Sequence, residues 1–129
     1  MQVVWIGIGG ALGSVLRFFM QSRIQAAYPG NFPMGTLCVN LSGSLVIGFL
    51  GGWFLSQPVA DNLKLFLMVG ILGGYTTFSS FALENLILIR EGHVKAVLIY
   101  LFTSNTLGVG LACGGFLAAR ALSRSVAGP

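Results

Sequence analysis

Two phenylalanines, Phe78 and Phe81, stand three residues apart in a segment that also carries several hydroxyl groups. In a helix this spacing places both rings on one face. An aromatic ring has a positive edge, so two rings presented edge-on beside hydroxyl and amide donors can attract a small anion without a fixed positive charge. Two core phenylalanines have the same spacing, and the spacing alone favours that simpler interpretation.

The residues just before this pair, GGYTT at 73–77, form a poor helix, because two adjacent glycines are followed by two β-branched threonines. We therefore expect a helix break near Gly73–Thr77, close to the middle of an apolar segment. Backbone carbonyls freed by such a break are a ready oxygen site for a small cation. The alternative is that the glycines only allow two helices to approach closely.

Polar side chains also recur at helical spacing elsewhere. Thr36, Asn40 and Ser44 follow one another every four residues, and Tyr100 and Ser104 share a face in the last apolar segment. These groups can line a pathway across a membrane. They can equally form hydrogen bonds between helices, and for Asn40 the sequence alone favours hydrogen bonding between helices.

Glu84 is the acidic residue that lies deepest in an apolar segment, on a polar stripe with Thr77 and Ser80. A glutamate inside a membrane is usually functional or paired. Its partner is predicted to be a hydroxyl group, unless the residue lies near the membrane interface.

The chain that must position these groups is strongly apolar. Of its 129 residues, 55% are hydrophobic and 8% are charged, and the mean hydropathy is +0.87. Soluble domains carry about 25% charged residues, so a soluble enzyme is excluded. The net charge of +4 is too thinly spread to form a basic patch, so no nucleic-acid partner is expected. Cys38 and Cys113 lack metal-binding spacing and are interpreted as small apolar fillers.

Long runs without charge predict the architecture. A helix needs about 20 apolar residues to cross a bilayer. The sequence predicts one all-α transmembrane domain over residues 1–129, with spans near residues 3–20, 36–55, 63–89 and 94–121 and a break in the third. The segment YPGNFP at 28–33 supplies the turn between the first two spans.

Four spans place both termini on one side of the membrane, and the positive charges are nearly balanced between the two sides. The side of the termini carries Lys64, Arg120 and Arg124, and the opposite side carries Arg17, Arg23, Arg90 and Lys95. The positive-inside rule therefore has little difference to act on. Both orientations should insert, and two copies can pair as an antiparallel homodimer in the lipid bilayer. The alternative is a single orientation set by Arg17 or Arg23.

Three motifs, in this order, resemble the CrcB/Fluc family of fluoride channels: GGALGSVLR at 9–17, GTLCVNLSG at 35–43 and GILGGYTTFSSF at 70–81. The resemblance covers essentially the whole chain. It implies a dual-topology, antiparallel homodimer in the cell inner membrane that exports fluoride passively and confers fluoride resistance. It further implies two pores along the dimer interface and a central structural sodium ion. The choice of fluoride comes from the resemblance alone.

The resemblance also implies roles for individual residues. Sodium would bind to the backbone carbonyls of Gly73 and Thr76, and Arg17 and Glu84 match an arginine and a glutamate of the family pattern. The fluoride pathway would be formed by Asn40, Phe78, Phe81, Ser79, Ser80, Tyr100 and Ser104. The chain departs from the family at Ser80, where threonine is frequent. It also departs at residues 107–109, where family members often show a Gly-Ser pair.

The runner-up function is a small dual-topology multidrug exporter that exchanges its substrate for protons. Such a protein needs a titratable acid deep in its first span, whereas the only charge in this first span is Arg17. A membrane subunit that transports nothing is a third interpretation. The sequence has no GxxxxGK[ST] motif for ATP, so transport is expected to follow the electrochemical gradient.

Overall fold

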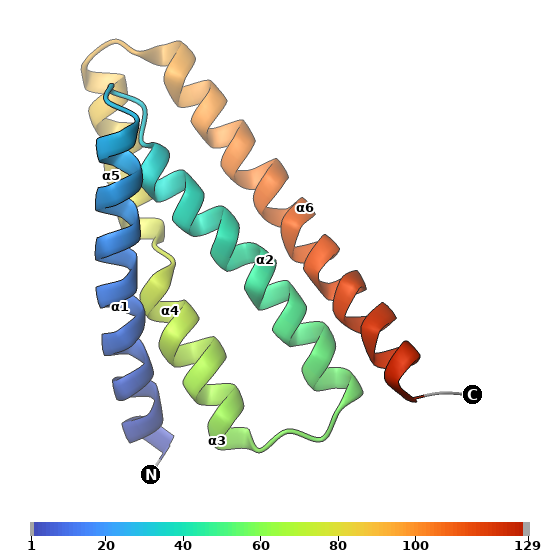
Figure 1. The fold of residues 1–129 in the computed structure, drawn as a ribbon. Coiled ribbons are helices and arrows are strands. Elements are labelled where there is room, and N and C mark those ends of the chain that lie inside the picture. The colour runs from blue at the N-terminus through green and yellow to red at the C-terminus, as the bar shows by residue number, and fades with distance from the viewer. Residues whose placement is uncertain (1, 128–129) are drawn as a thin grey trace.

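The computed structural model describes residues 2–127, and every regular element in this range is a helix (Figure 1). The first two hydrophobic segments form α1 (Gln2–Ala27) and α2 (Met34–Ser56), and the last forms α6 (Val94–Ala127). Between them, the third segment is built from α3 (Asp61–Lys64), the π-helix η1 (Leu65–Leu72), α4 (Gly73–Tyr75) and α5 (Phe78–Arg90). Four helical stretches are long and apolar enough to cross a membrane. The prediction of an all-α chain with four such stretches is confirmed.

The four stretches run alternately up and down, so the described ends of α1 and α6 lie toward the same end of the molecule, although well apart from each other (Figure 1). We call this the terminal end, and it also carries the connection 57–60 between α2 and α3. The opposite end, here called the loop end, carries the connections 28–33 and 91–93. Lys64 therefore lies toward the terminal end, whereas Arg90 lies at the loop end.

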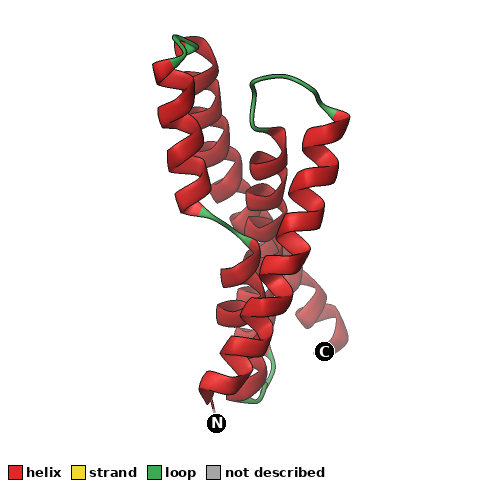
Figure 2. Ribbon diagram, turned by 90° about the vertical axis from the view of Figure 1, so that its left-hand side faces the viewer, coloured by secondary structure: helices red, strands yellow, loops and turns green. Residues whose placement is uncertain are grey.

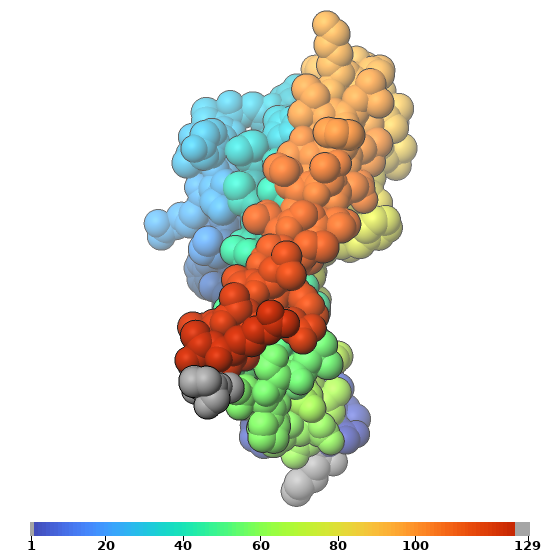
Figure 3. All heavy atoms as spheres, turned by 90° about the vertical axis from the view of Figure 1, so that its right-hand side faces the viewer, coloured from blue at the N-terminus to red at the C-terminus, as the bar shows by residue number. Residues whose placement is uncertain are grey.

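Close helix packing depends on glycine at two crossings. Where α1 crosses the third stretch, a Cβ at Gly13 would collide with the Ile71 carbonyl, and one at Gly74 with the backbone of Gly10. Where α2 packs along α6, a Cβ at Gly48 would collide with the backbone of Ala112. Figure 3 shows α6, in orange to red, running along this face of the molecule. Small residues thus set the distances between the helices that carry the polar groups.

The buried core of a single chain is small. One cluster contains Leu37, Phe81 and Tyr100, and a second contains Val39 and Tyr75. Most other large apolar side chains are exposed, in all four helical stretches. Such a surface is expected of a chain whose outer faces contact lipid or another membrane helix.

The third stretch is interrupted at Thr76 and Thr77, which Figure 2 shows as a short link midway along the helices. Their backbones are extended, with φ −81° and ψ 157° at Thr76 and φ −148° and ψ 120° at Thr77. Helical geometry resumes at Phe78, where the Thr77 hydroxyl accepts a hydrogen bond of 3.2 Å from the Ser80 N–H. Gly73 itself is helical, so the interruption lies at the threonines.

Candidate functional site

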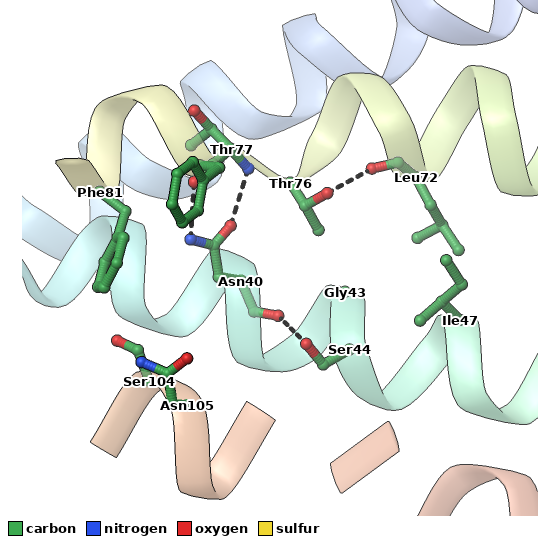
Figure 4. Close-up of a pocket in the computed structure, with 11 residues that line it drawn as sticks. Asn40, Gly43, Ser44, Ile47, Leu72, Thr76, Thr77, Phe81, Ser104 and Asn105 are labelled. Carbon is green, nitrogen blue, oxygen red and sulfur yellow. Dashed lines mark hydrogen bonds between the residues drawn. The ribbon is translucent and has the colours of Figure 1, made fainter. Parts of the chain in front are cut away.

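Asn40 on α2 satisfies the backbone groups that the interruption exposes (Figure 4). Its Nδ2 donates to the Thr77 carbonyl at 2.9 Å, and its Oδ1 accepts from the Thr77 N–H at 2.8 Å. In an uninterrupted helix the Thr77 N–H would donate to the Gly73 carbonyl instead. Unpaired backbone groups are costly within a bilayer, so the amide of Asn40 stabilises the extended link. The hydrogen bonds between helices that were predicted for Asn40 are therefore made with the backbone of Thr77, where the third stretch is interrupted.

Neighbouring residues fix the chain just before the link. The Thr76 hydroxyl donates to the Leu72 carbonyl at 2.9 Å, and the Tyr75 hydroxyl lies 2.9 Å from the hydroxyl of Ser42 on α2. A Cβ at Gly43 would collide with the methyl group of Thr76. The absence of a side chain at Gly43 therefore gives Thr76 room against α2.

The resemblance assigns sodium to the carbonyls of Gly73 and Thr76, which are the first residue of α4 and the residue that follows it. The Gly73 carbonyl lacks its usual helical partner, because the Thr77 N–H donates to Asn40. Gly73 is exposed in the single chain, and a Cβ there would meet nothing within 4 Å. Residues 2–127 contain no cluster of three His, Cys, Asp or Glu side chains that could hold a metal ion. A cation near the link would thus depend on uncharged oxygens.

A hollow of about 290 Å³ lies beside the link, between α2, α5 and α6 (Figure 4). Four of the predicted pathway residues line it: Asn40, Phe78, Phe81 and Ser104. The Ser104 hydroxyl is buried and has no hydrogen-bond partner in the described part of the chain. One proton of the Asn40 amide also remains after the bond to Thr77. The hollow therefore combines two uncharged donors with two aromatic rings.

The phenylalanine rings contact each other but have different surroundings. Their centroids are 5.8 Å apart, Phe78 is 80% exposed and Phe81 is 9% exposed. Phe81 also meets Tyr100 with centroids 4.9 Å apart and the ring planes 63° from parallel, an edge-to-face contact. The exposed ring of Phe78 is left for lipid or a second chain to cover.

Three of the predicted pathway residues lie outside the hollow: Ser79, Ser80 and Tyr100. The hydroxyls of Ser79 and Ser80 lie 3.3 Å and 3.1 Å from that of Thr77, at the first turn of α5. Neither serine is among the residues that line the hollow. In the single chain they therefore stabilise the start of α5, and the structure does not bring them together with Asn40.

Glu84 is held by hydroxyl groups, as the sequence predicted. Thr36 donates to its Oε1 at 2.5 Å, and Tyr100 donates to its Oε2 at 2.8 Å. The sequence analysis missed Gln21, whose Nε2 donates to the Thr36 hydroxyl at 2.9 Å. Arg17, one turn earlier on α1, is half-buried and makes no ion pair within residues 2–127.

A second hollow, of about 630 Å³, opens at the loop end and has Glu84, Gln21 and Gln25 in its wall. Gln25 organises the connection beside it, because its Oε1 accepts from the Gly35 N–H at 3.1 Å. Its Nε2 lies within hydrogen-bonding distance of three connection carbonyls, those of Tyr28, Gly30 and Phe32. Glu84 is hydrogen-bonded to Tyr100, whose ring packs against Phe81 in the wall of the hollow beside the link.

Residues 4–116 match the family described as CrcB-like protein, Camphor Resistance (CrcB). This chain belongs to the CrcB-like family. The match includes all three motifs on which the resemblance was based, so the resemblance to this family is confirmed.

Relatives in the CrcB-like family bear the name fluoride-specific ion channel FluC. The protein of Helicobacter pylori (strain P12) is 38% identical over 118 residues, which cover 89% of this chain and 91% of the relative. That of Helicobacter acinonychis (strain Sheeba) is 39% identical, covering 89% and 93%. That of Parabacteroides distasonis is 42% identical over 108 residues, covering 84% of each chain. These are names of channels and not of enzymes. With four helical stretches that are long and apolar enough to cross a membrane, this chain is a multi-pass membrane protein.

Proposed function

We propose that this chain is a fluoride-selective channel of the cell inner membrane that exports fluoride passively down its electrochemical gradient. The observation that carries the proposal is the hollow beside the helix link, which is lined by Asn40, Ser104, Phe78 and Phe81 together. The relatives are named fluoride-specific ion channels, which supports fluoride as the ion.

The chemistry of the hollow suits a small, strongly hydrated anion. A selective pore replaces the water around its ion with donors, and each site must bind weakly enough to let the ion leave. The free proton of the Asn40 amide, the Ser104 hydroxyl and the positive ring edges supply such donors. No lysine or arginine lines the hollow, so an anion meets no fixed charge there that would hold it tightly.

The pore is proposed to be completed by a second, antiparallel copy, with two pores along the dimer interface. Phe78 is exposed beside the hollow and Gly73 is open, so this face of a single chain has room for a partner. The nearly balanced positive charges at the two ends favour insertion in both orientations. A sodium ion at the centre would bind to the carbonyls of Gly73 and Thr76 from both copies.

Replacing Phe81 or Phe78 by isoleucine is expected to slow fluoride efflux from liposomes by about tenfold. Isoleucine keeps an apolar side chain but removes the positive ring edge. A tenfold change in rate corresponds to about 1.4 kcal/mol in the barrier. A fluoride-selective electrode measures the efflux, and Phe19→Ile is the matched control, because Phe19 is exposed on α1 and lines neither of the two hollows.

Wild-type rates in both variants would argue against the aromatic pathway. Absence of fluoride efflux from wild-type liposomes, with transport of a cationic dye, would favour the exporter instead. Protein purified and reconstituted with N-methyl-D-glucamine in place of Na⁺ should conduct less and recover when Na⁺ returns. Equal rates throughout would count against the sodium site.

A thiol-labelling experiment tests the antiparallel dimer. In a background of Cys38→Ala and Cys113→Ala, single cysteines replace Gln57 near the terminal end or Glu91 at the loop end. An impermeant thiol reagent added to intact cells should label about half of each variant, because both orientations insert. Full labelling at one position with none at the other would show a single orientation and refute the dual topology.

A further inference from the structure

Three helices form a hydrogen-bonded chain that begins at Gln21. The Nε2 of Gln21 on α1 donates to the hydroxyl of Thr36 on α2, and that hydroxyl donates to Oε1 of Glu84 on α5. Thr36 is 1% exposed, so water does not compete for its hydroxyl. A hydroxyl has one proton. Because the amide nitrogen of Gln21 can only donate, it directs the proton of Thr36 toward Glu84.

The other oxygen of Glu84 is held from a fourth helix. The hydroxyl of Tyr100 on α6, which is fully buried, donates to Oε2 at 2.8 Å. Each carboxyl oxygen of Glu84 therefore accepts from one hydroxyl: Oε1 from Thr36 on α2, and Oε2 from Tyr100 on α6. Glu84 makes no ion pair within residues 2–127, so these hydroxyls are what fixes its orientation.

The proposed pathway is taken to continue past Tyr100 and Glu84 into the hollow at the loop end. Tyr100 packs against Phe81, which lines the hollow beside the link, and Glu84 itself lines the hollow at the loop end. A carboxylate that is free to turn toward a passing anion would repel it, and more strongly away from bulk water. A carboxylate whose oxygens accept hydrogen bonds from Thr36 and Tyr100 is held away from the anion and repels the anion less.

We propose that Gln21 is a positioning residue for the channel: by orienting the Thr36 hydroxyl it holds the Glu84 carboxylate away from the anion path. This inference rests on the proposed function. It assigns a transport role to a side chain that lies outside the hollow beside the link.

Two substitutions at residue 21 distinguish the effect of its hydrogen-bond donor from the effect of its side-chain shape. Gln21→Met removes the donor, and fluoride efflux should fall about tenfold at every pH. In Gln21→Glu, an ionised carboxylate accepts the Thr36 proton instead and draws it away from Glu84. Once protonated, the introduced carboxyl group would donate as the glutamine does, so efflux in this variant should recover as the pH falls. A role in packing alone would give no such recovery.

Other ionisable groups near this chain of bonds must be accounted for. Glu84 and Tyr100 belong to it, Arg17 lies one turn away on α1, and Glu91 shares a smaller hollow with Glu84. All four are unchanged in both variants, so a pH dependence that appears only in Gln21→Glu is assigned to residue 21. Gln57→Met and Gln57→Glu are the matched controls, because Gln57 lies in the α2–α3 connection.

Infrared spectroscopy tests the same inference without transport. The carboxyl band of Glu84, assigned by its loss in Glu84→Gln, should shift in Gln21→Met and not in Gln57→Met. In a Thr36→Val background, Gln21→Met should cause no further change in the Glu84 band or in efflux, because the hydroxyl that connects Gln21 to Glu84 is gone. An unchanged band, or unchanged efflux in Gln21→Met, overturns the positioning role. A shifted band together with no wild-type fluoride efflux would uphold the positioning of Glu84 and refute the proposed function.

Discussion

Asn40→Leu is expected to abolish fluoride efflux and to lower the free energy of unfolding by about 2–6 kcal/mol. The substitution removes both hydrogen bonds between the Asn40 amide and the Thr77 backbone and leaves a buried N–H and a buried carbonyl without partners. Each such group costs about 1–3 kcal/mol. It also removes an anion donor from the hollow. Thermal unfolding in detergent and efflux from liposomes measure the two effects.

Asn62→Leu is the matched control, because Asn62 is exposed in α3 and does not line the hollow beside the link. Asn40→Asp separates the two bonds. An aspartate still accepts from the Thr77 N–H but sets an oxygen against the Thr77 carbonyl, so its stability should be no better than that of the leucine variant. An Asn40→Leu protein that melts and conducts like the wild type would show that the link does not depend on this amide.

Gly13→Ala is expected to lower the free energy of unfolding by about 1–3 kcal/mol, the usual cost of overpacking. A Cβ at Gly13 would collide with the Ile71 carbonyl oxygen and lie 2.9 Å from the Tyr75 nitrogen. Both obstacles are backbone atoms of the third stretch, so a side-chain rotation cannot relieve the clash. Because α1 packs against the elements that lead into the link, efflux should fall as well. Unfolding in detergent and liposome efflux measure these effects.

Gly7→Ala is the matched control on the same helix. A Cβ at Gly7 would meet nothing within 4 Å, and alanine is a better helix former than glycine by about 1 kcal/mol. This variant should therefore be as stable as the wild type or slightly more so. Equal destabilisation by the two substitutions would mean that the α1 crossing is not the close contact described here.

The four spans were predictable because apolar length decides whether a segment can cross a bilayer. Their ends were less so. The first helix continues from the predicted residue 20 to Ala27, and the last from residue 121 to Ala127. These extra turns carry polar residues, such as Gln21 and Gln25, which a count of apolar residues excludes. The hydrogen bonds that retain them connect distant parts of the sequence.

Local propensity located the interruption only approximately. Glycine is a poor helix former, yet Gly74 remains helical because its missing side chain lets α1 approach at Gly10. The extended residues are Thr76 and Thr77, and the backbone of Thr77 is hydrogen-bonded to Asn40 on α2. Contacts with α1 and α2 therefore place the interruption a few residues after the glycines, although glycine has the lower helix propensity.

The candidate site was predicted in part. Residues at helical spacing, such as Phe78 and Phe81, do share one hollow, because three-residue spacing fixes a common face. Ser79 and Ser80 do not join them, since the first turn of α5 engages their hydroxyls with Thr77. Gln21 gave no signal, because a polar residue at the end of a span resembles an ordinary membrane flank.

The link at Thr76 and Thr77 also has an electrical consequence. A continuous helix cancels its peptide dipoles internally and presents partial charges only at its ends, near the membrane surfaces. Here the stretch that finishes at Tyr75 and the helix that starts at Phe78 each expose an end within the apolar interior. Opposite partial charges, up to about half an elementary charge on a long helix, therefore face each other across two residues. The fold generates a local field there, although none of residues 73–78 is acidic or basic.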